Sequence, residues 1–250
     1  MSKEALSGSY IESMKGKHPA VPLTTHYTII AGSDRKSNIG HAIASQLRKE
    51  RHLVEEFCKD DHDLGRERYN FSPSATSLVL ANGRSYMDWI EKQSDEEIEE
   101  MLNDNLRGSI RAARDFVKAT IHTPQRKNII FIGSMAHKAV LNGSSVYCAA
   151  KAGLAHFSRC LAWELAPKGY NVFCVHPSNT EGTPMTEETI RGLMRYRELS
   201  REQAEQYWGA SLPRHQWLQP QDLANLVSFL LSGKADYLSG ADLNMGGGQR

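Results

Sequence analysis

The sequence predicts an α/β fold in which a doubly wound, mostly parallel β-sheet lies between two layers of helices. Short β-rich runs alternate along the chain with segments whose apolar residues recur at helical spacing. A glycine, a proline or a polar residue follows several of these runs, namely Gly32, Asn82, Gly83, Ser134 and Pro177. Because ligands of such sheets bind beyond the carboxyl ends of the strands, these positions predict where a site lies.

The amino-terminal half of the predicted sheet is less regular than the rest. Residues 26–33, HYTIIAGS, form a strand with a glycine turn, and a helix with one apolar face follows over residues 39–50. Residues 52–57 and 68–72 have the composition of two short strands, yet neither precedes a helical segment. Residues 76–83, TSLVLANG, form a buried strand. We therefore expect a shortened region between the second and fourth strands, at a sheet edge that helices cover poorly.

The carboxyl-terminal half alternates more clearly. Ser94 followed by Glu97 is a capping box and predicts the start of a long helix. Residues 183–215 are charged and predict an insertion of short helices that forms much of the substrate pocket. The other expected elements are helix 95–121, strand 127–134, helix 145–167, strand 170–177, helix 220–233 and strand 240–248.

Composition excludes several classes of protein. The 250 residues are 40% hydrophobic and 24% charged with a net charge of +1, which predicts no general attraction to nucleic acid or to a membrane surface. No apolar run is long enough for a signal peptide or a membrane span. We expect residues 1–25 to be an arm and residues 26–250 to be a single domain of a cytoplasmic protein.

The cysteines and histidines predict neither disulfides nor a metal site. Cys58, Cys148, Cys160 and Cys174 lack C-x-x-C spacing, and the histidines lack H-x-x-x-H spacing. We expect reduced, mostly buried thiols and no metal.

Three polar residues predict acid–base chemistry. Tyr147 and Lys151 are four residues apart and therefore share one helix face. A nearby ammonium favours the phenolate and lowers the pKa of a tyrosine, and Ser134, just after a strand, can hydrogen-bond a carbonyl. Such pairs also arise by chance in helices, so their position between a strand end and a helix start carries the interpretation.

The turn after the first strand is a candidate phosphate site. Residues 31–44, AGSDRKSNIGHAIA, place a glycine turn before a helix, where backbone N–H groups face a pyrophosphate. Asn38 stands where a further glycine is typical, and the alternative is an ordinary strand-to-helix turn.

Taken together, these segments resemble the short-chain dehydrogenase/reductase family, of the Tyr-x-x-x-Lys type, over roughly residues 26–248. The resemblance implies a Rossmann-like fold and a nicotinamide cofactor. It is carried, in family order, by AGSDRKSNIG, LANG, DNLRG, IGSMA, YCAAK, HPSNTEGTPM and YLSGADLNMGGG.

The resemblance implies a role for each matching residue. Tyr147 would be the general acid or base, Lys151 would tune it and hold the nicotinamide ribose, and Ser134 would polarise the substrate oxygen. Asn105 would lie at a helix kink and hold a water. The expected cofactor-binding residues are Gly32, Ser33, Arg35, Lys36, Asn38, Ile39, Lys59, Asn70, Phe71, Asn82, Gly83, Tyr147, Lys151, Pro177, Thr180 and Thr183.

The chain also departs from the family pattern. The loop from Gly32 to Gly40 is two residues longer than the commonest form, LANG lacks a doubled asparagine, and Ser178 replaces a glycine. Residues 59–80 leave no room for the two helices that normally surround the third strand.

The expected cofactor is NADP, with NAD as an alternative. Arg35 and Lys36 place two cations in the glycine loop. The second strand is expected to end near Phe57 or Cys58, where no acid stands and Lys59 comes next. Asp60 and Asp61 follow directly, so a shift of two residues would favour NAD.

The expected activity is reduction of a ketone or oxidation of an alcohol. The alternatives are a non-catalytic binding subunit, and enoyl reduction or epimerisation in a biosynthetic pathway. If the resemblance holds, helices 95–121 and 145–167 pair across a two-fold axis, which predicts a homodimer or homotetramer acting on a small molecule.

Overall fold

One parallel sheet organises the molecule. The computed structural model describes residues 26–32, 39–57, 69–210 and 212–249. Within them six strands pair in the order β2-β1-β3-β4-β5-β6, and every pairing is parallel. The strands are β1 (Tyr27–Ala31), β2 (Leu53–Phe57), β3 (Ser77–Leu80), β4 (Lys127–Ile132), β5 (Tyr170–Pro177) and β6 (Asp242–Met245). The predicted doubly wound α/β fold is confirmed.

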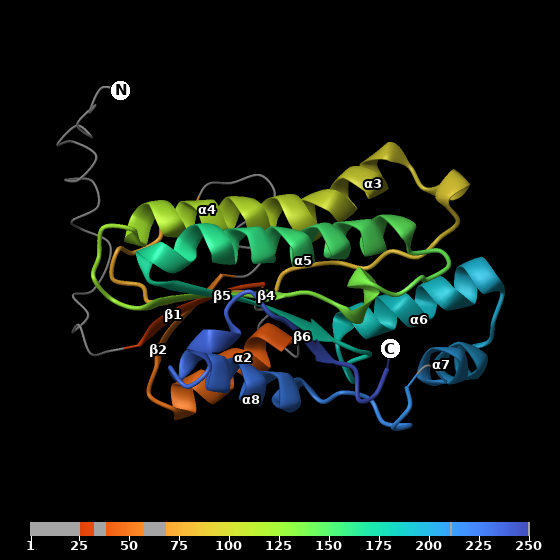
Figure 1. Ribbon diagram of the computed structural model, residues 1–250. Helices are drawn as coiled ribbons and strands as arrows, with labels where there is room; N and C mark the ends of the chain where they lie inside the picture. The colour runs from red at the N-terminus through yellow and green to blue at the C-terminus, as the bar shows by residue number, and fades with distance from the viewer. Residues whose placement is uncertain (1–25, 33–38, 58–68, 211, 250) are drawn as a thin grey trace.

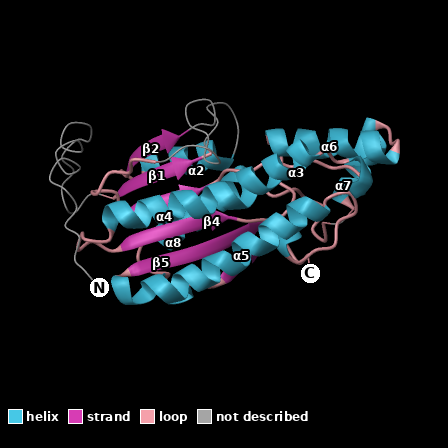
Figure 2. Ribbon diagram, turned by 90° about the horizontal axis from the view of Figure 1, so that it is seen from above, coloured by secondary structure: helices cyan, strands magenta, loops and turns pink. Residues whose placement is uncertain are grey.

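Helices cover both faces of the sheet (Figures 1 and 2). On one face lie α3 (Asp95–Leu102), α4 (Gly108–Thr120) and α5 (Ser145–Leu165), and on the other α2 (Ile39–Lys49) and α8 (Pro220–Leu231). Strands β1, β3 and β4 are buried along their whole length, as is typical of parallel strands covered on both faces.

Each face has its own apolar core. On the α4 and α5 side, Phe116 and Leu154 pack against strand residues such as Phe131. On the α2 and α8 side, Leu47 and Val227 pack against the opposite face of the same strands. The alternation of side chains along each strand supplies both cores.

Two helices project beyond the carboxyl ends of the strands. They are α6 (Pro184–Arg197) and α7 (Arg201–Gly209), and they pack on each other through a smaller apolar cluster around Leu193. They lie at the end of the molecule in Figure 1 and correspond to the insertion predicted over residues 183–215.

The short helical turns lie between these elements. They are the 3₁₀ turns η1 (Ile90–Lys92), η3 (Met135–His137), η4 (Ala166–Lys168) and η5 (Asp236–Leu238), and the π-helical turn η2 (Asn103–Arg107).

The sheet edge at β2 matches its prediction only in part. β2 is the edge strand, and Leu53 on it is exposed. The strand predicted over residues 68–72 is wrong, because residues 69–72 pair with no strand. Tyr69 and Phe71 instead pack their rings into the core against Phe57, which explains the alternating apolar pattern without a strand.

The expectation about the thiols also needs correction. Cys160 is exposed on the outer face of α5, so the described thiols are not mostly buried, although Cys174 is. Trp163, on the same helix, is 86% exposed. Among the residues described, no helix is both long and apolar enough to cross a membrane.

Candidate active site

A cavity of about 400 Å³ lies beyond the carboxyl ends of the strands. The turns after β1, β3, β4 and β5 line it, together with the start of α5 and of α6. Parallel strands bring these turns to one edge of the sheet, so segments far apart in the sequence meet there. The predicted residues Gly32, Ile39, Asn82, Gly83, Ser134, Tyr147, Lys151, Pro177, Thr180 and Thr183 all line the cavity.

Tyr147 and Lys151 project from the first two turns of α5. Both side chains are buried, and the Lys151 Nζ lies 5.7 Å from the centroid of the Tyr147 ring. The Lys151 ammonium donates a hydrogen bond to the Ile132 carbonyl at 3.2 Å. The Tyr147 hydroxyl meets the sulfur of Met185, 3.8 Å away on α6.

Burial controls the ionisation of this pair. It raises the pKa of Tyr147 to about 12, and a hydrogen bond with Ser134 opposes this rise only partly. Burial also lowers the pKa of Lys151 to about 8. The expected lowering of the tyrosine pKa toward neutrality is therefore wrong: the pKa is raised, because the phenol loses its water on burial.

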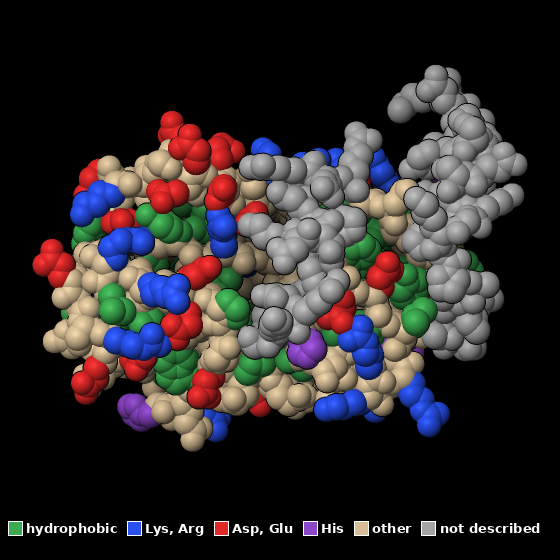
Figure 3. Space-filling model, turned by 180° about the vertical axis from the view of Figure 1, so that it is seen from behind, with side chains coloured by type: hydrophobic (Ala, Val, Ile, Leu, Met, Phe, Trp, Pro, Cys, Tyr) green, Lys and Arg blue, Asp and Glu red, His purple; other side chains and the backbone are tan. Residues whose placement is uncertain are grey.

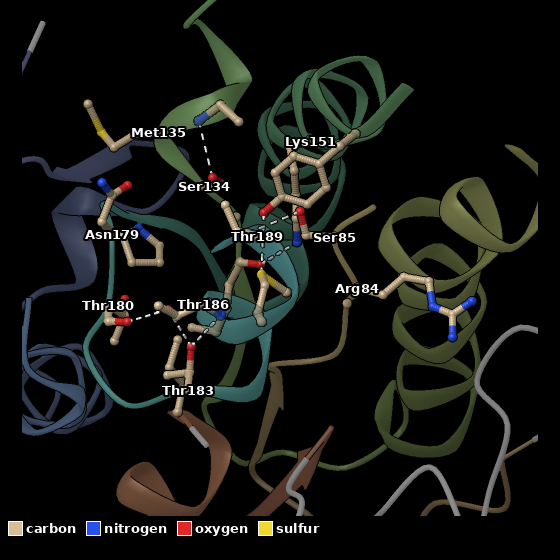
Figure 4. A pocket seen from close by; sticks show the side chains of 18 of the residues that line it. Arg84, Ser85, Ser134, Met135, Lys151, Asn179, Thr180, Thr183, Thr186 and Thr189 are labelled. Atoms are coloured by element: carbon tan, nitrogen blue, oxygen red, sulfur yellow. Dashed lines mark hydrogen bonds between the residues drawn. The ribbon is translucent and has the colours of Figure 1, made fainter. Parts of the chain in front are cut away.

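Ser134 lies directly after β4 in extended backbone, at the start of η3. Its hydroxyl oxygen accepts a hydrogen bond from the backbone N–H of Ala136 at 3.1 Å. In Figure 4 the side chains of Ser134 and Lys151 lie at the same part of the cavity. The strand end thus sets one side of the site and α5 the other.

Asn105 lies at a break in helical geometry, as predicted. It belongs to η2, the π-helical turn between α3 and α4, and it is fully buried. Its side-chain nitrogen donates to the backbone carbonyls of Arg84 and Met101, both at 2.9 Å. Its side-chain oxygen has no hydrogen-bond partner, so an acceptor beside Lys151 and Gly83 stays available.

Two glycines allow the loops at this edge to approach closely. Gly32 has φ +85°, and a Cβ there would lie 2.4 Å from the backbone nitrogen of Asn82. A Cβ on Gly83 would lie 2.6 Å from the Asn105 oxygen and 3.3 Å from the Lys151 Nζ. The Asn82 side chain ties this turn to the helix by donating to the Asp104 carbonyl at 2.6 Å. Glycine at these two positions therefore lets the loops pack closely, and both residues line the cavity.

The remaining predicted cofactor residues divide into two groups. Asn70 and Phe71 are not brought to the cavity, since Asn70 is exposed and Phe71 is packed in the core against Phe116. The others lie outside the described residues, namely Ser33, Arg35, Lys36, Asn38 and Lys59.

Sequence reasoning missed several residues of the cavity wall. Ser85 and Thr189 form a hydroxyl pair 3.5 Å apart, and Thr186 bonds to Thr183 at 2.9 Å (Figure 4). The spacing of three residues along α6 places these threonines on one helix face, a signal that was present in the sequence.

Two of the charged residues that line the cavity, Arg84 and Asp104, form an ion pair with each other. The Arg84 guanidinium turns away from the hydroxyl pair in Figure 4 and forms ion pairs with Glu100 and Asp104. On the molecular face in Figure 3, both signs of charge are interspersed, in keeping with the net charge of +1.

Comparison with known proteins shows which family and which relatives the chain is similar to. The model of a family described as enoyl-(acyl carrier protein) reductase matches residues 78–250. The 3-oxoacyl-(acyl-carrier-protein) reductase of Escherichia coli is 34% identical over 171 residues, 68% of this chain and 65% of the relative. Sorbitol-6-phosphate 2-dehydrogenase of the same organism is 30% identical over 172 residues, 69% and 66% of the two chains. The matches thus span just under two thirds of these relatives.

Solved structures share the fold over more of the chain. A variant of the actinorhodin polyketide ketoreductase with NADPH superposes with a TM-score of 0.79 at 22% identity, covering 92% of this chain and 99% of that one. Sorbitol-6-phosphate 2-dehydrogenase of Erwinia amylovora gives 0.77 at 23% identity, covering 89% and 99%. These two likenesses establish the fold, and together with the match over residues 78–250 they identify the chain as a member of the short-chain dehydrogenase/reductase family.

Proposed function

We propose that the protein is an NADP-dependent oxidoreductase that reduces a small ketone or oxidises the corresponding alcohol. The observation that carries this proposal is the convergence of buried Tyr147 and Lys151 with Ser134 on one cavity at the carboxyl edge of the sheet. The family membership supports the same chemistry.

The cavity fits a nicotinamide dinucleotide. Gly32 and Gly83 line the cavity without side chains of their own, and the unpaired Asn105 oxygen offers a polar contact for a water. When bound, the cofactor supplies the hydride. Gly32, Ile39 and Asn82 would hold its adenosine and pyrophosphate side, and Lys151, Pro177, Thr180 and Thr183 its nicotinamide side.

Tyr147 would supply the proton during ketone reduction. With a pKa of about 12 the phenol is protonated at neutral pH, which is the form that donates to a carbonyl oxygen. Ser134 would hydrogen-bond the same oxygen and hold it beside the phenol. The Lys151 ammonium, protonated below about pH 8, would stabilise the negative charge that develops there.

Replacing Tyr147 by Phe tests this role. We expect kcat for ketone reduction to fall about 100- to 10,000-fold, the usual contribution of a general acid, while the NADPH dissociation constant stays near that of the wild type. Tyr237→Phe is the matched control, because this tyrosine is fully exposed. Unchanged turnover in the Tyr147 variant would refute the assignment.

The preference for NADP is proposed from the sequence. The Phe57 side chain at the end of β2 lines the cavity, and Lys59 follows two residues later. We expect Lys36→Ala and Lys59→Ala to weaken NADPH binding roughly ten-fold, since each removes a charge partner of the 2′-phosphate, and to leave NADH binding unchanged. Fluorescence titration measures both, and equal losses for the two cofactors would contradict a contact of these lysines with the 2′-phosphate.

Enoyl reduction is the second candidate, favoured by the description of the matched family model. A panel of ketones, alcohols and enoyl thioesters separates the two reactions. A non-catalytic binding subunit would instead bind neither NADPH nor NADH in the same titration.

We also infer a cytoplasmic location, which the free thiols of Cys148, Cys160 and Cys174 support.

A further inference from the structure

A fully buried histidine lies directly beneath Ser134. His176 is the penultimate residue of β5 and is 0% exposed. Its Nδ1 lies 3.3 Å from the backbone nitrogen of Ser134, and its Nε2 lies 3.2 Å from the Asp242 carboxylate on β6. Burying an imidazole costs free energy unless both nitrogens find hydrogen-bond partners. The partners of His176 therefore call for an explanation.

The contact with Asp242 decides the tautomer of His176. A carboxylate oxygen only accepts, so Nε2 carries the proton and donates it to Asp242. Nδ1 then carries a lone pair and accepts the N–H of Ser134, 3.3 Å away; it also lies 3.2 Å from the Ser134 carbonyl oxygen, to which it has no proton to donate. Burial, followed by the charge of neighbouring His137, lowers the pKa of His176 to about 4, so the ring is neutral near pH 7 and keeps this arrangement.

A second histidine holds the other backbone group of Ser134. The ring of His137 stacks on that of His176 with centroids 3.7 Å apart and planes at 21°. The His137 Nδ1 lies 2.8 Å from the Ser134 carbonyl oxygen and therefore donates to it. His176 thus hydrogen-bonds the N–H of Ser134, and His137 hydrogen-bonds the C=O of the same residue.

The neighbouring residues leave room for the two histidine rings. A Cβ on Gly133 would lie 2.4 Å from the His176 Nδ1, so only glycine leaves room for the ring there. Asp242 also pairs with Arg159 on α5, the helix that carries Tyr147 and Lys151. This ion pair joins β6 to α5, and the His176–Asp242 contact joins β6 to β5, so Asp242 connects the histidine beside Ser134 with the helix that carries Tyr147 and Lys151.

A shared metal ion is a weaker explanation of this cluster. His137, His176 and Asp242 offer ligand atoms within 4.8 Å of one another. However, both Nδ1 atoms already bond the Ser134 backbone and the His176 Nε2 bonds Asp242. Stacked rings also point their nitrogens side by side, whereas ligands of one ion converge on it.

We propose that Asp242, His176 and His137 form a clamp that fixes the main chain of Ser134 and so aims its hydroxyl at the substrate oxygen. These are positioning residues that act through Ser134, and this role rests on the proposed function. A displacement of the hydroxyl by a fraction of an ångström is enough to weaken a hydrogen bond made in the transition state.

Histidine tautomers test the clamp without any substrate. In NMR spectra of the protein with isotope-labelled histidine, we expect His176 as the neutral Nε2–H form and His137 with a proton on Nδ1, both at neutral pH. His122→Asn, a change of an exposed histidine, should leave both signals in place. An Nδ1–H tautomer or a charged ring at His176 would overturn the clamp.

Kinetics of two isosteric variants test its consequence. Asn places an acceptor oxygen where the His176 Nδ1 stands, whereas Leu of the same shape offers none. We expect His176→Leu to lower kcat about 10- to 100-fold with little change in KM for NADPH, and His176→Asn to recover most of that loss. Equal losses in both variants would contradict positioning through the Ser134 N–H.

The two measurements separate the possible failures. A wild-type protein that binds cofactor and reduces no member of the substrate panel overturns the proposed function, and the tautomers then decide the clamp alone. If the Leu variant does not fold, the Asn variant and the tautomers of the wild type still decide it.

Discussion

Lys151 illustrates how function at a single residue opposes stability. Its ammonium is buried within a cavity wall, and burial lowers its pKa from 10.5 to about 8. Below pH 8 the folded protein therefore carries the whole cost of holding this charge away from water. As the pH rises from 8 to 10.5 the folded lysine is already neutral while the unfolded one still binds its proton, so stability rises through that window.

Replacing Lys151 by Met should therefore stabilise the protein and inactivate it. A shift of this size corresponds to about 3 kcal/mol, so we expect a higher free energy of unfolding near pH 7, measured with urea. The variant should also lack the rise in stability above pH 8. Lys168→Met, at an exposed lysine, is the control and should change stability by less than about 0.5 kcal/mol. A Met variant less stable than the wild type would contradict the argument.

The same residue marks the limit of inference from sequence. The spacing of Tyr147 and Lys151 predicts a shared helix face, because helical geometry is local, and the structure confirms it. The direction of the Tyr147 pKa was wrong, because it depends on how much water the folded chain removes from the phenol. Burial is set by segments far away in the sequence, as is the contact of His176 with Asp242.

At the scale of elements, the wall formed by α6 depends on one close approach. A Cβ on Gly192 would lie 2.8 Å from the Cβ of Met87, on the loop that carries Ser85. Glycine therefore lets α6 lie against this loop, and the Ser85–Thr189 pair spans the contact. The sequence predicts short helices over residues 183–215, whereas the need for glycine in α6 follows only from this tertiary contact.

Gly192→Ala should push α6 away from the loop that carries Met87. Alanine is the better helix former, yet the clash with Met87 should make the variant less stable by about 1–3 kcal/mol and raise KM for the ketone. Gly209→Ala is the matched control, because the nearest atom to its added Cβ lies 3.8 Å away. Thermal unfolding and steady-state kinetics measure both effects, and a stabilised variant with unchanged KM would show that α6 and the Met87 loop do not touch as closely.

At the scale of the whole molecule, the paired helices α4 and α5 present a long outer surface (Figure 2). Trp163 stands on that surface with 86% of its area exposed, beside exposed Cys160. A large exposed aromatic ring on a regular helix pair is typical of an interface, and a two-fold axis would bring each ring against the partner. We therefore expect a homodimer or homotetramer in solution.

Trp163→Glu tests this expectation, because a carboxylate at the centre of an apolar contact leaves a buried charge without a partner. We expect sedimentation of the wild type as a dimer or tetramer at micromolar concentration, and of the variant as a smaller species. Ile90→Glu, on the exposed turn η1 away from α5, introduces the same charge and should leave the assembly intact. A monomeric wild type would show that Trp163 faces water, and the surface of α4 and α5 would then need another explanation.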